Sequence, residues 1–205
     1  MNTDAFPPSA FARDDESDDS EFYAPARLVT HIDDQAIAAL GDFDCKMIAP
    51  GSTVFDLMSS WVSHLPDALK LSGVIGHGMN LAELASNPRL TQTFVQDLNR
   101  NPALPLDRAS CDAALCCVSV QYLQRPLEVF AEVRRVLKQG APFIVSYSNR
   151  CFPTKAVAIW RSLDQRGHAS LIHRYMDRAG LTGIEAHVLA NGMNGDPLIA
   201  VTGLA

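Results

Sequence analysis

Short apolar runs rich in β-branched and aromatic residues recur from residue 53 onward, and most are followed by a segment of helical periodicity. This alternation predicts βαβ units, because parallel strands need a crossover that a helix usually supplies. The last two strands are separated by a short loop and should form an antiparallel hairpin. The expected strands are residues 53–58, 72–78, 91–98, 111–120, 141–149, 183–191 and 196–205. The predicted fold class is therefore α/β, a mainly parallel seven-stranded sheet with helices on both faces and a C-terminal antiparallel hairpin.

The clearest helix is expected at residues 126–140, where Pro126 suits the first turn and Gly140 suits the C-terminal cap. Apolar side chains recur there at helical spacing. The other expected helices are one or two in residues 22–43 with a stop at Gly41, one at 60–71 interrupted or ended near Pro66, one at 80–87 with Asn80 as N-cap, and helical segments at 155–167 and 169–180.

The net charge of −6 is concentrated at the N-terminus. Residues 1–21 carry seven acidic side chains and one basic side chain, so the remaining 16 acidic and 16 basic side chains balance. The composition of residues 1–21 is typical of a disordered acidic tail. We therefore expect a tail at 1–21 and a single folded domain at 22–205.

A neutral body offers no basic field for nucleic acid, so we expect no nucleic-acid partner. The apolar runs are too short to span a bilayer and the acidic start does not resemble an export signal, which predicts a cytoplasmic protein without a membrane anchor. The odd cysteine count and the absence of CxxC favour reduced thiols, with Cys116 and Cys117 as core residues of a strand. No GxSxG elbow, phosphate-binding loop or metal-ligand cluster appears, and no metal site is predicted.

The stretch Thr53 to Pro66, TVFDLMSSWVSHLP, begins like a buried strand that runs into a helix. Nucleotide-binding α/β proteins usually carry glycines at such a junction, because a ligand approaches the backbone closely there. Met58, Ser59, Ser60 and Trp61 occupy the junction instead. Two serines are the smallest usable replacements, whereas Trp61 either stacks on a ligand or packs in the core.

The second half of the chain carries a set of ordered markers. They are Leu104-Pro105, Ser110-Cys111-Asp112 at the start of a strand, the helix exit from Glu132 to Ala141 (EVRRVLKQGA), and the segment YMDRAGLTGIE at residues 175–185. In this order they resemble the class I S-adenosylmethionine-dependent methyltransferases, and in particular the small branch known as type 11. The resemblance covers roughly residues 45–203 and implies a Rossmann-like sheet.

The resemblance also implies S-adenosyl-L-methionine as cofactor and S-adenosyl-L-homocysteine as product, held at the carboxyl edge of the sheet. The residues that match the family's cofactor positions are Asp56, Met58, Ser59, Ser60, Gly76, His77, Gly78, Met79, Asp97, Leu98, Cys117 and Val118. In the family, an acid after the third strand lies near the adenine, and here that residue is Asp97.

Two parts of the family pattern are missing. The first turn lacks its glycines, and Gly78 stands where the family has an acid for the ribose hydroxyls. His77, Asn80 or backbone groups would then have to bind the ribose. Asp97 could equally be a solvated loop acid or a helix cap, and His77 a surface or capping histidine.

A methyl acceptor must be aligned behind the methyl group, and a general base helps only if the acceptor loses a proton. His31 is the preferred base and Tyr147 a second catalytic candidate. Other candidates near the mouth are Tyr23, Arg27, Asn149, Arg150, His168, His173 and Arg174. We expect a small-molecule substrate and a monomer or homodimer. The alternative is a non-catalytic relative whose pocket holds a ligand or a protein partner.

Overall fold

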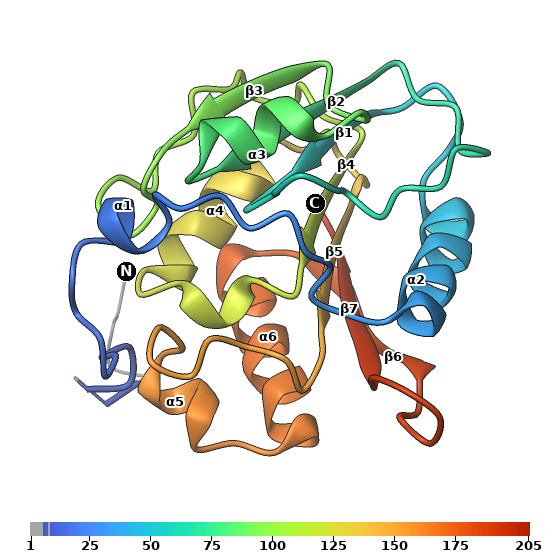
Figure 1. Ribbon diagram of the computed structural model, residues 1–205. Helices are drawn as coiled ribbons and strands as arrows, with labels where there is room; N and C mark the ends of the chain where they lie inside the picture. The colour runs from blue at the N-terminus through green and yellow to red at the C-terminus, as the bar shows by residue number, and fades with distance from the viewer. Residues whose placement is uncertain (1–5, 8) are drawn as a thin grey trace.

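The computed structural model describes residues 6, 7 and 9–205, so the part of the expected tail at residues 1–5 and 8 lies outside the described residues. Its centre is a seven-stranded sheet in the order β3-β2-β1-β4-β5-β7-β6 (Figure 1). The strands are β1 (Thr53–Asp56), β2 (Gly73–Gly78), β3 (Gln92–Val95), β4 (Ala113–Cys117), β5 (Pro142–Tyr147), β6 (Thr182–Ala190) and β7 (Leu198–Leu204). All seven expected strands are present, and the predicted fold class is confirmed.

The first five strands are parallel, and β7 enters between β5 and β6 in antiparallel orientation to both. The order reverses direction beside β1, because the chain proceeds outward from β1 to β3 and then returns to place β4 on the other side. This switch point is where open parallel sheets bind ligands, at the carboxyl ends of the strands.

The helices are α1 (Asp19–Phe22), α2 (Asp34–Met47), α3 (Leu81–Ser86), α4 (Pro126–Val136), α5 (Ala158–Arg161) and α6 (Gln165–Ala179), with a 3₁₀ turn η1 (Val120–Tyr122). Side chains of α4 and α6, such as Phe130 and Tyr175, pack into the largest apolar cluster on one side of the sheet. On the other side, α2 and the segment at residues 65–69 cover β1 and β4. Helices thus cover both faces, as the alternation predicted.

The helix expected at residues 60–71 is not formed, and this prediction was wrong. The segment runs as irregular chain with Leu65 and Leu69 buried beneath it. His64 has a left-handed backbone (φ 55°) and Pro66 cannot continue a helical hydrogen-bond ladder, so both residues oppose a helix. Burial of the two leucines, which gave the segment its helical appearance, is achieved without one.

Helix α2 continues past the predicted stop at Gly41 and ends at Met47. Gly41 is needed for packing rather than termination, because a Cβ there would lie 2.9 Å from the Pro66 ring carbon Cγ. The helix begins after Asp33, whose carboxylate accepts a hydrogen bond from the Ala36 N–H at 2.9 Å. Of the expected helical region 22–43, residues 34–43 lie in α2 and residue 22 ends α1, whereas residues 23–33 form no helix.

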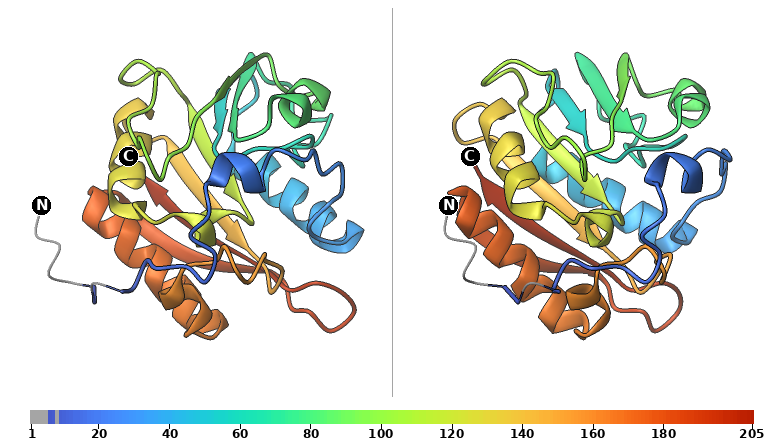
Figure 2. Two further views of the ribbon diagram at one scale, coloured as in Figure 1. Left: turned by 60° about the vertical axis from the view of Figure 1, so that its left-hand side comes forward. Right: turned by 90° about the vertical axis from the view of Figure 1, so that its left-hand side faces the viewer.

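We refer to residues 9–33 as the N-terminal strap. Its first part runs beside α5 and α6 before reaching α1 (Figure 2). The Ala10 and Ala12 carbonyls accept hydrogen bonds from the Ile159 and Ala158 N–H groups, both at 2.8 Å. The expectation of a disordered tail therefore fails for residues 9–21. Composition alone could not show that distant basic side chains neutralise its acids.

Lys155 is the centre of this neutralisation. Its side chain is completely buried, and Nζ lies 3.2 Å from Asp19 Oδ1, 3.4 Å from Asp15 Oδ2 and 2.8 Å from the Ser17 carbonyl oxygen. A buried ammonium is tolerated only when it is paired and hydrogen-bonded in this way. Arg13, Arg100 and Arg161 pair with further strap acids at Asp19, Asp18 and Asp14.

Within the residues described, the longest helices are too short or too polar to cross a lipid bilayer. No group of three or more His, Cys, Asp or Glu side chains among them is arranged to hold a metal ion.

Replacing Lys155 by methionine should leave Asp15 without its buried cation and weaken the hold on Asp19. We expect a loss of about 3 kcal/mol in the free energy of unfolding, or roughly 6–12 °C in Tm. Limited proteolysis should also cut within residues 9–22 sooner. Lys138→Met, which removes a half-exposed pair with Asp112, is the control and should change Tm by no more than about 2 °C. Equal effects of the two variants would contradict the anchoring role of Lys155.

Candidate active site

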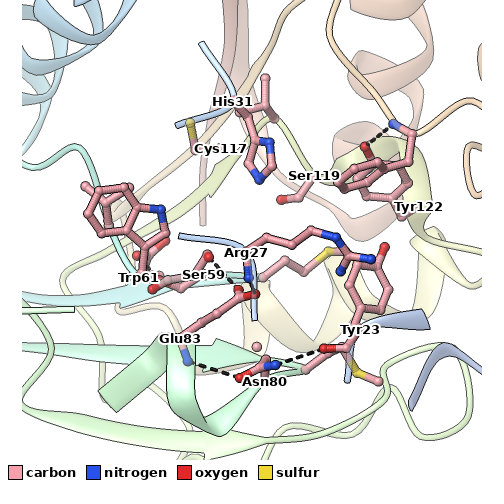
Figure 3. A pocket seen from close by; sticks show the side chains of 18 of the residues that line it. Tyr23, Arg27, His31, Ser59, Trp61, Asn80, Glu83, Cys117, Ser119 and Tyr122 are labelled. Atoms are coloured by element: carbon pink, nitrogen blue, oxygen red, sulfur yellow. Dashed lines mark hydrogen bonds between the residues drawn. The ribbon is translucent and has the colours of Figure 1, made fainter. Parts of the chain in front are cut away.

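A cavity of about 550 Å³ opens at the switch point of the sheet. That volume lies within the range of about 300–1,000 Å³ usual for small-molecule sites. Its floor comes from the carboxyl ends of β1, β2 and β4 and from the loop after β3, whereas the strap and the loop at residues 150–152 form the opposite wall. Figure 3 shows side chains from these walls facing one another across the cavity.

The glycine-free turn after β1 adopts a glycine-like backbone at one position. Met58 has φ 57°, a left-handed conformation that is uncommon for a residue with a Cβ. Its N–H donates to His77 Nδ1 at 3.1 Å, and the next N–H, of Ser59, donates to the His77 carbonyl at 2.6 Å. Both turn amides are therefore engaged by β2 and do not project into the cavity.

His77 acts as a brace between three segments. Its Nδ1 accepts a hydrogen bond from the Met58 N–H, so the ring proton is on Nε2. Nε2 donates to the carbonyl oxygen of Gln96, which follows β3, at 2.8 Å. Burial lowers the pKa of His77 to about 4, which keeps the imidazole neutral at pH 7. Both ring nitrogens are occupied, so His77 has none left to bind a ribose.

The two β2 glycines are required by the packing of the chain itself. A Cβ on Gly76 would lie 2.4 Å from Leu90 Cδ1, and one on Gly78 would lie 2.6 Å from the Ser59 carbonyl oxygen. Gly78 lines the cavity, whereas Gly76 does not. The expected role of Gly76 beside a cofactor therefore has no support from its position.

Asp56 lies at the floor of the cavity with only 3% of its surface exposed. Its Oδ2 accepts a hydrogen bond from Ser59 Oγ at 2.6 Å. Burial raises the pKa of Asp56 to about 6, although the hydrogen bonds from Ser59 and Ser63 oppose this shift. The carboxyl group has no cationic partner among the described residues, so a positively charged ligand would complement it.

Glu83 is a cavity residue that the sequence analysis missed. It lies in the first turn of α3, and its two carboxylate oxygens accept from the Arg27 N–H at 2.7 Å and from Ser60 Oγ at 2.6 Å. It therefore joins the strap to the β1 turn. The only available signal was its position five residues after Gly78, just inside a helix capped by Asn80.

Asn80 is confirmed as the N-cap of α3, since its Oδ1 accepts from the Glu83 N–H. Its Nδ2 donates to the carbonyl oxygens of Tyr23 and Ala24, both at 2.9 Å. Like His77, Asn80 thus has its polar side-chain atoms engaged within the protein.

Asp97 and Leu98 line the cavity beyond β3. One carboxylate oxygen of Asp97 accepts from the Asn99 N–H at 2.9 Å. Met79, Cys117 and Val118 also line it. Val118 has φ 44°, a strained conformation for a β-branched residue, and strain of this kind clusters at functional sites.

The two catalytic candidates lie in different places. His31 lines the cavity with its ring 5.7 Å from that of Phe152, and its pKa is lowered mainly by partial burial and also by Arg27, with Glu83 opposing. Tyr147 does not line the cavity. It is buried, and its hydroxyl donates to the Gln165 carbonyl at 2.6 Å beside Trp160, so its assignment as a catalytic residue is corrected.

Most other candidates divide in the same way. Tyr23, Arg27 and Arg150 line the cavity, whereas His168 stacks on Trp160 at 3.8 Å outside it. Trp61 is a wall residue anchored by a hydrogen bond from Nε1 to the Val29 carbonyl at 3.0 Å. Neither Trp61 nor Met58 fills the cavity.

A cationic nucleoside fits this set of residues. The cavity has sufficient volume, an acid without a cationic partner at its floor, and a further acid at the β3 end. The amides of Met58 and Ser59 are engaged, so the amino-acid end of such a ligand would be held by side chains and by other backbone groups of the lining.

A family model described as a methyltransferase domain matches residues 76–145. The match runs from within β2 to within β5 and therefore includes Asp97, Leu98, Cys117 and Val118 but not the β1 turn.

Among curated proteins, a malonyl-[acyl-carrier protein] O-methyltransferase from Marinomonas sp. (strain MWYL1) is 32% identical over 73 residues. That alignment covers 36% of this chain, which spans about a quarter (26%) of the length of the relative.

Two solved structures share the fold. A chain of the complex between the Haloferax volcanii Trm112 methyltransferase activator and its methyltransferase aligns with a TM-score of 0.64 and 17% identity, covering 84% of this chain and 90% of the other. The [4+2]-cyclase SpnF aligns with a TM-score of 0.63 and 14% identity, covering 88% of each chain. At these identities the likeness shows the fold alone.

The pKa of Asp44, on α2, is raised from 3.8 to about 8 by burial and by the charge of Asp56. Its Oδ1 accepts no hydrogen bond from any described residue. The folded protein therefore binds this proton more tightly than the unfolded chain does, so stability falls as pH rises from about 4 to about 8.

Asp44→Asn should remove this cost. We expect Tm to rise at pH 8 by an amount equivalent to about 1–3 kcal/mol and to change little at pH 4. Asp42→Asn, on the exposed side of the same helix, is the control and should be neutral at both pH values. A Tm difference between Asp44→Asn and the wild type that does not grow with pH would contradict the raised pKa.

Proposed function

We propose that this chain, a class I methyltransferase by its fold and by the domain at residues 76–145, binds S-adenosyl-L-methionine and methylates a small molecule. The observation that carries the proposal is the position of the cavity. It lies at the switch point, with Asp56 at the end of β1 and Asp97 beyond β3 on its lining. When bound, the cofactor supplies an electrophilic methyl group on a positively charged sulfur, with S-adenosyl-L-homocysteine as product.

In this proposal three acidic side chains, Asp56, Glu83 and Asp97, each bind a different part of the cofactor. Asp56 holds the ammonium of the amino-acid end, with Met58, Ser59 and Ser60 as the adjacent wall. Glu83, which still has unused lone pairs, accepts from the ribose hydroxyls beside Gly78 and Met79.

Asp97 and Leu98 hold the adenine end. One carboxylate oxygen of Asp97 is already placed by the Asn99 N–H. Cys117 and Val118 close the opposite side from the end of β4.

His31 faces the cavity from the strap. Its lowered pKa leaves the ring neutral at pH 7, so it can accept a proton from an acceptor that must lose one. The strap and the loop at residues 150–152 exclude water from the acceptor side, which favours alignment of the reacting atoms.

A second candidate function is a non-catalytic ligand-binding or partner-binding protein of the same fold. It is favoured by the engagement of the Met58 and Ser59 amides by His77, which leaves the turn with fewer backbone donors for a ligand. The Haloferax methyltransferase in complex with its activator gives a precedent for protein partners of this fold.

Calorimetric titration with S-adenosyl-L-methionine and S-adenosyl-L-homocysteine tests the proposal. Asp97→Asn should weaken both ligands by about tenfold or more, the effect of losing a hydrogen bond to a charged group. Asp107→Asn, an exposed loop acid outside the cavity, should leave both affinities unchanged. No binding of either compound to the wild-type protein would favour the non-catalytic function.

The affinity for S-adenosyl-L-methionine should rise with pH through the pKa of Asp56, near 6 in the free protein. A cation lowers the pKa of an adjacent carboxyl, so binding releases the Asp56 proton, and that release becomes unfavourable in acid. We expect affinity about tenfold weaker at pH 5 than at pH 7.5, with a much smaller pH dependence in Asp56→Asn. A pH profile unchanged by Asp56→Asn would exclude Asp56 as the responsible group.

A further inference from the structure

Arg27 places an unpaired cation inside the cavity. Its guanidinium donates to the Phe22 carbonyl at 2.9 Å and to the Pro25 carbonyl at 3.4 Å. Among the residues that the structure describes, no carboxylate lies within salt-bridge distance of it. By contrast, the other arginine on the cavity wall, Arg150, is 2.8 Å from Asp196.

Aromatic rings hold the Arg27 guanidinium in place. It lies 4.7 Å from the centroid of Phe22 and 5.4 Å from that of Phe152. Such contacts orient a guanidinium without consuming its N–H groups. Arginine has five N–H donors and two hydrogen bonds are made, so donors remain for a ligand.

Two tyrosine hydroxyls add to these donors. Figure 3 shows the Arg27 side chain pointing toward Tyr23 and Tyr122 and away from the Ser59 turn. The Tyr122 hydroxyl oxygen accepts from the Phe152 N–H at 2.8 Å and is also contacted by the Gln121 side chain, and its own proton can still be donated to a ligand. The Tyr23 hydroxyl has no hydrogen-bond partner among the described residues.

Both tyrosines remain protonated at neutral pH. Burial raises the pKa of Tyr122 to about 12 and also raises the pKa of Tyr23. A protonated phenol is uncharged and can donate a hydrogen bond to an anion without repelling it. Arg27, Tyr23 and Tyr122 therefore form a cluster of donors.

These donors come from the strap and from η1, not from the strand ends that hold the proposed cofactor. They are therefore available to a second ligand. Arg27 and Arg150 are the only lysine or arginine residues among the described cavity-lining residues, and Arg150 is paired. A single unpaired guanidinium suits a monoanion, and its planar fork matches a carboxylate.

We propose that the methyl acceptor is a small planar carboxylate, anchored by Arg27 with Tyr23 and Tyr122, its flat apolar part packing against Phe152. The assignment of this ligand as the acceptor rests on the proposed function. The anion site itself rests on the geometry of Arg27, Tyr23 and Tyr122 and does not depend on the proposed function.

The test compares the affinities of the wild-type protein for benzoate and cinnamate with its affinities for benzamide and cinnamamide. Binding is measured in each titration by ligand-observed NMR. It is carried out with and without S-adenosyl-L-homocysteine. Each carboxylate should bind at least about tenfold more tightly than its amide, the effect of one charge-assisted contact. Equal binding of acids and amides to the wild-type protein would overturn the proposal.

Arg27→Met should abolish this preference and Arg27→Lys should retain part of it. The backbone N–H of residue 27, which binds Glu83, is unchanged in both variants. Arg150→Met is the matched control and should keep the preference. Loss of the preference in Arg150→Met but not in Arg27→Met would overturn the assignment.

Titration of S-adenosyl-L-homocysteine itself separates the two proposals. Affinity for it should be unchanged in Arg27→Met. A matching loss there would mean that Arg27 holds the cofactor's own carboxylate, which overturns this inference but not the proposed function. If the wild-type protein binds no S-adenosyl-L-homocysteine yet shows the Arg27-dependent preference, the anion site stands, but its ligand is no methyl acceptor and the proposed function fails.

Discussion

The neutral imidazole of His77 joins three segments at the carboxyl edge of the sheet, and the geometry of the cavity depends on it. His77 lies in β2. It accepts a hydrogen bond from the Met58 N–H in the turn after β1 and donates one to the Gln96 carbonyl oxygen beyond β3. In glycine-containing turns of related folds the backbone amides can face a ligand, because no side chain intervenes. Here the brace turns those amides toward β2. The turn is thereby held in a left-handed conformation at Met58 without glycine.

In the proposed function, charged side chains therefore take over part of the ligand recognition that backbone donors of this turn would otherwise provide. The floor presents the buried Asp56 and the wall presents Glu83, both suited to a cation or hydroxyl donors. The opposite wall presents Arg27, which suits an anion. In the functions proposed above, these opposite charges would give separate places for a cationic cofactor and an anionic acceptor within one cavity.

The number of strands and their positions along the chain could be predicted from the sequence, because buried parallel strands leave continuous apolar runs between helical segments. The irregular conformation of residues 60–71 could not be predicted in this way. Leu65 and Leu69 satisfy a helical pattern, although His64 and Pro66 prevent the helix. Asp97 was predicted at the cavity from its position after the third strand, whereas His31 was predicted from its aliphatic neighbours and the acid pair that follows it. Glu83 and Arg27 owe their roles to the path of the strap, which depends on Lys155 far along the chain. Contacts between residues so far apart in the sequence leave no pattern in any short stretch of it, so sequence analysis does not reveal them.

The contacts of the strap also determine when this wall of the cavity can form during synthesis of the chain. Its residues are synthesised before the segments that they pack against, which include Asn99, Lys155 and Ile159. Helices and strands near the start of the chain can form early, but this wall of the cavity cannot close until residues beyond 159 have left the ribosome. Until then the ligand-binding edge of a nascent chain would stay open to solvent, and ligand binding would report that the strap has docked.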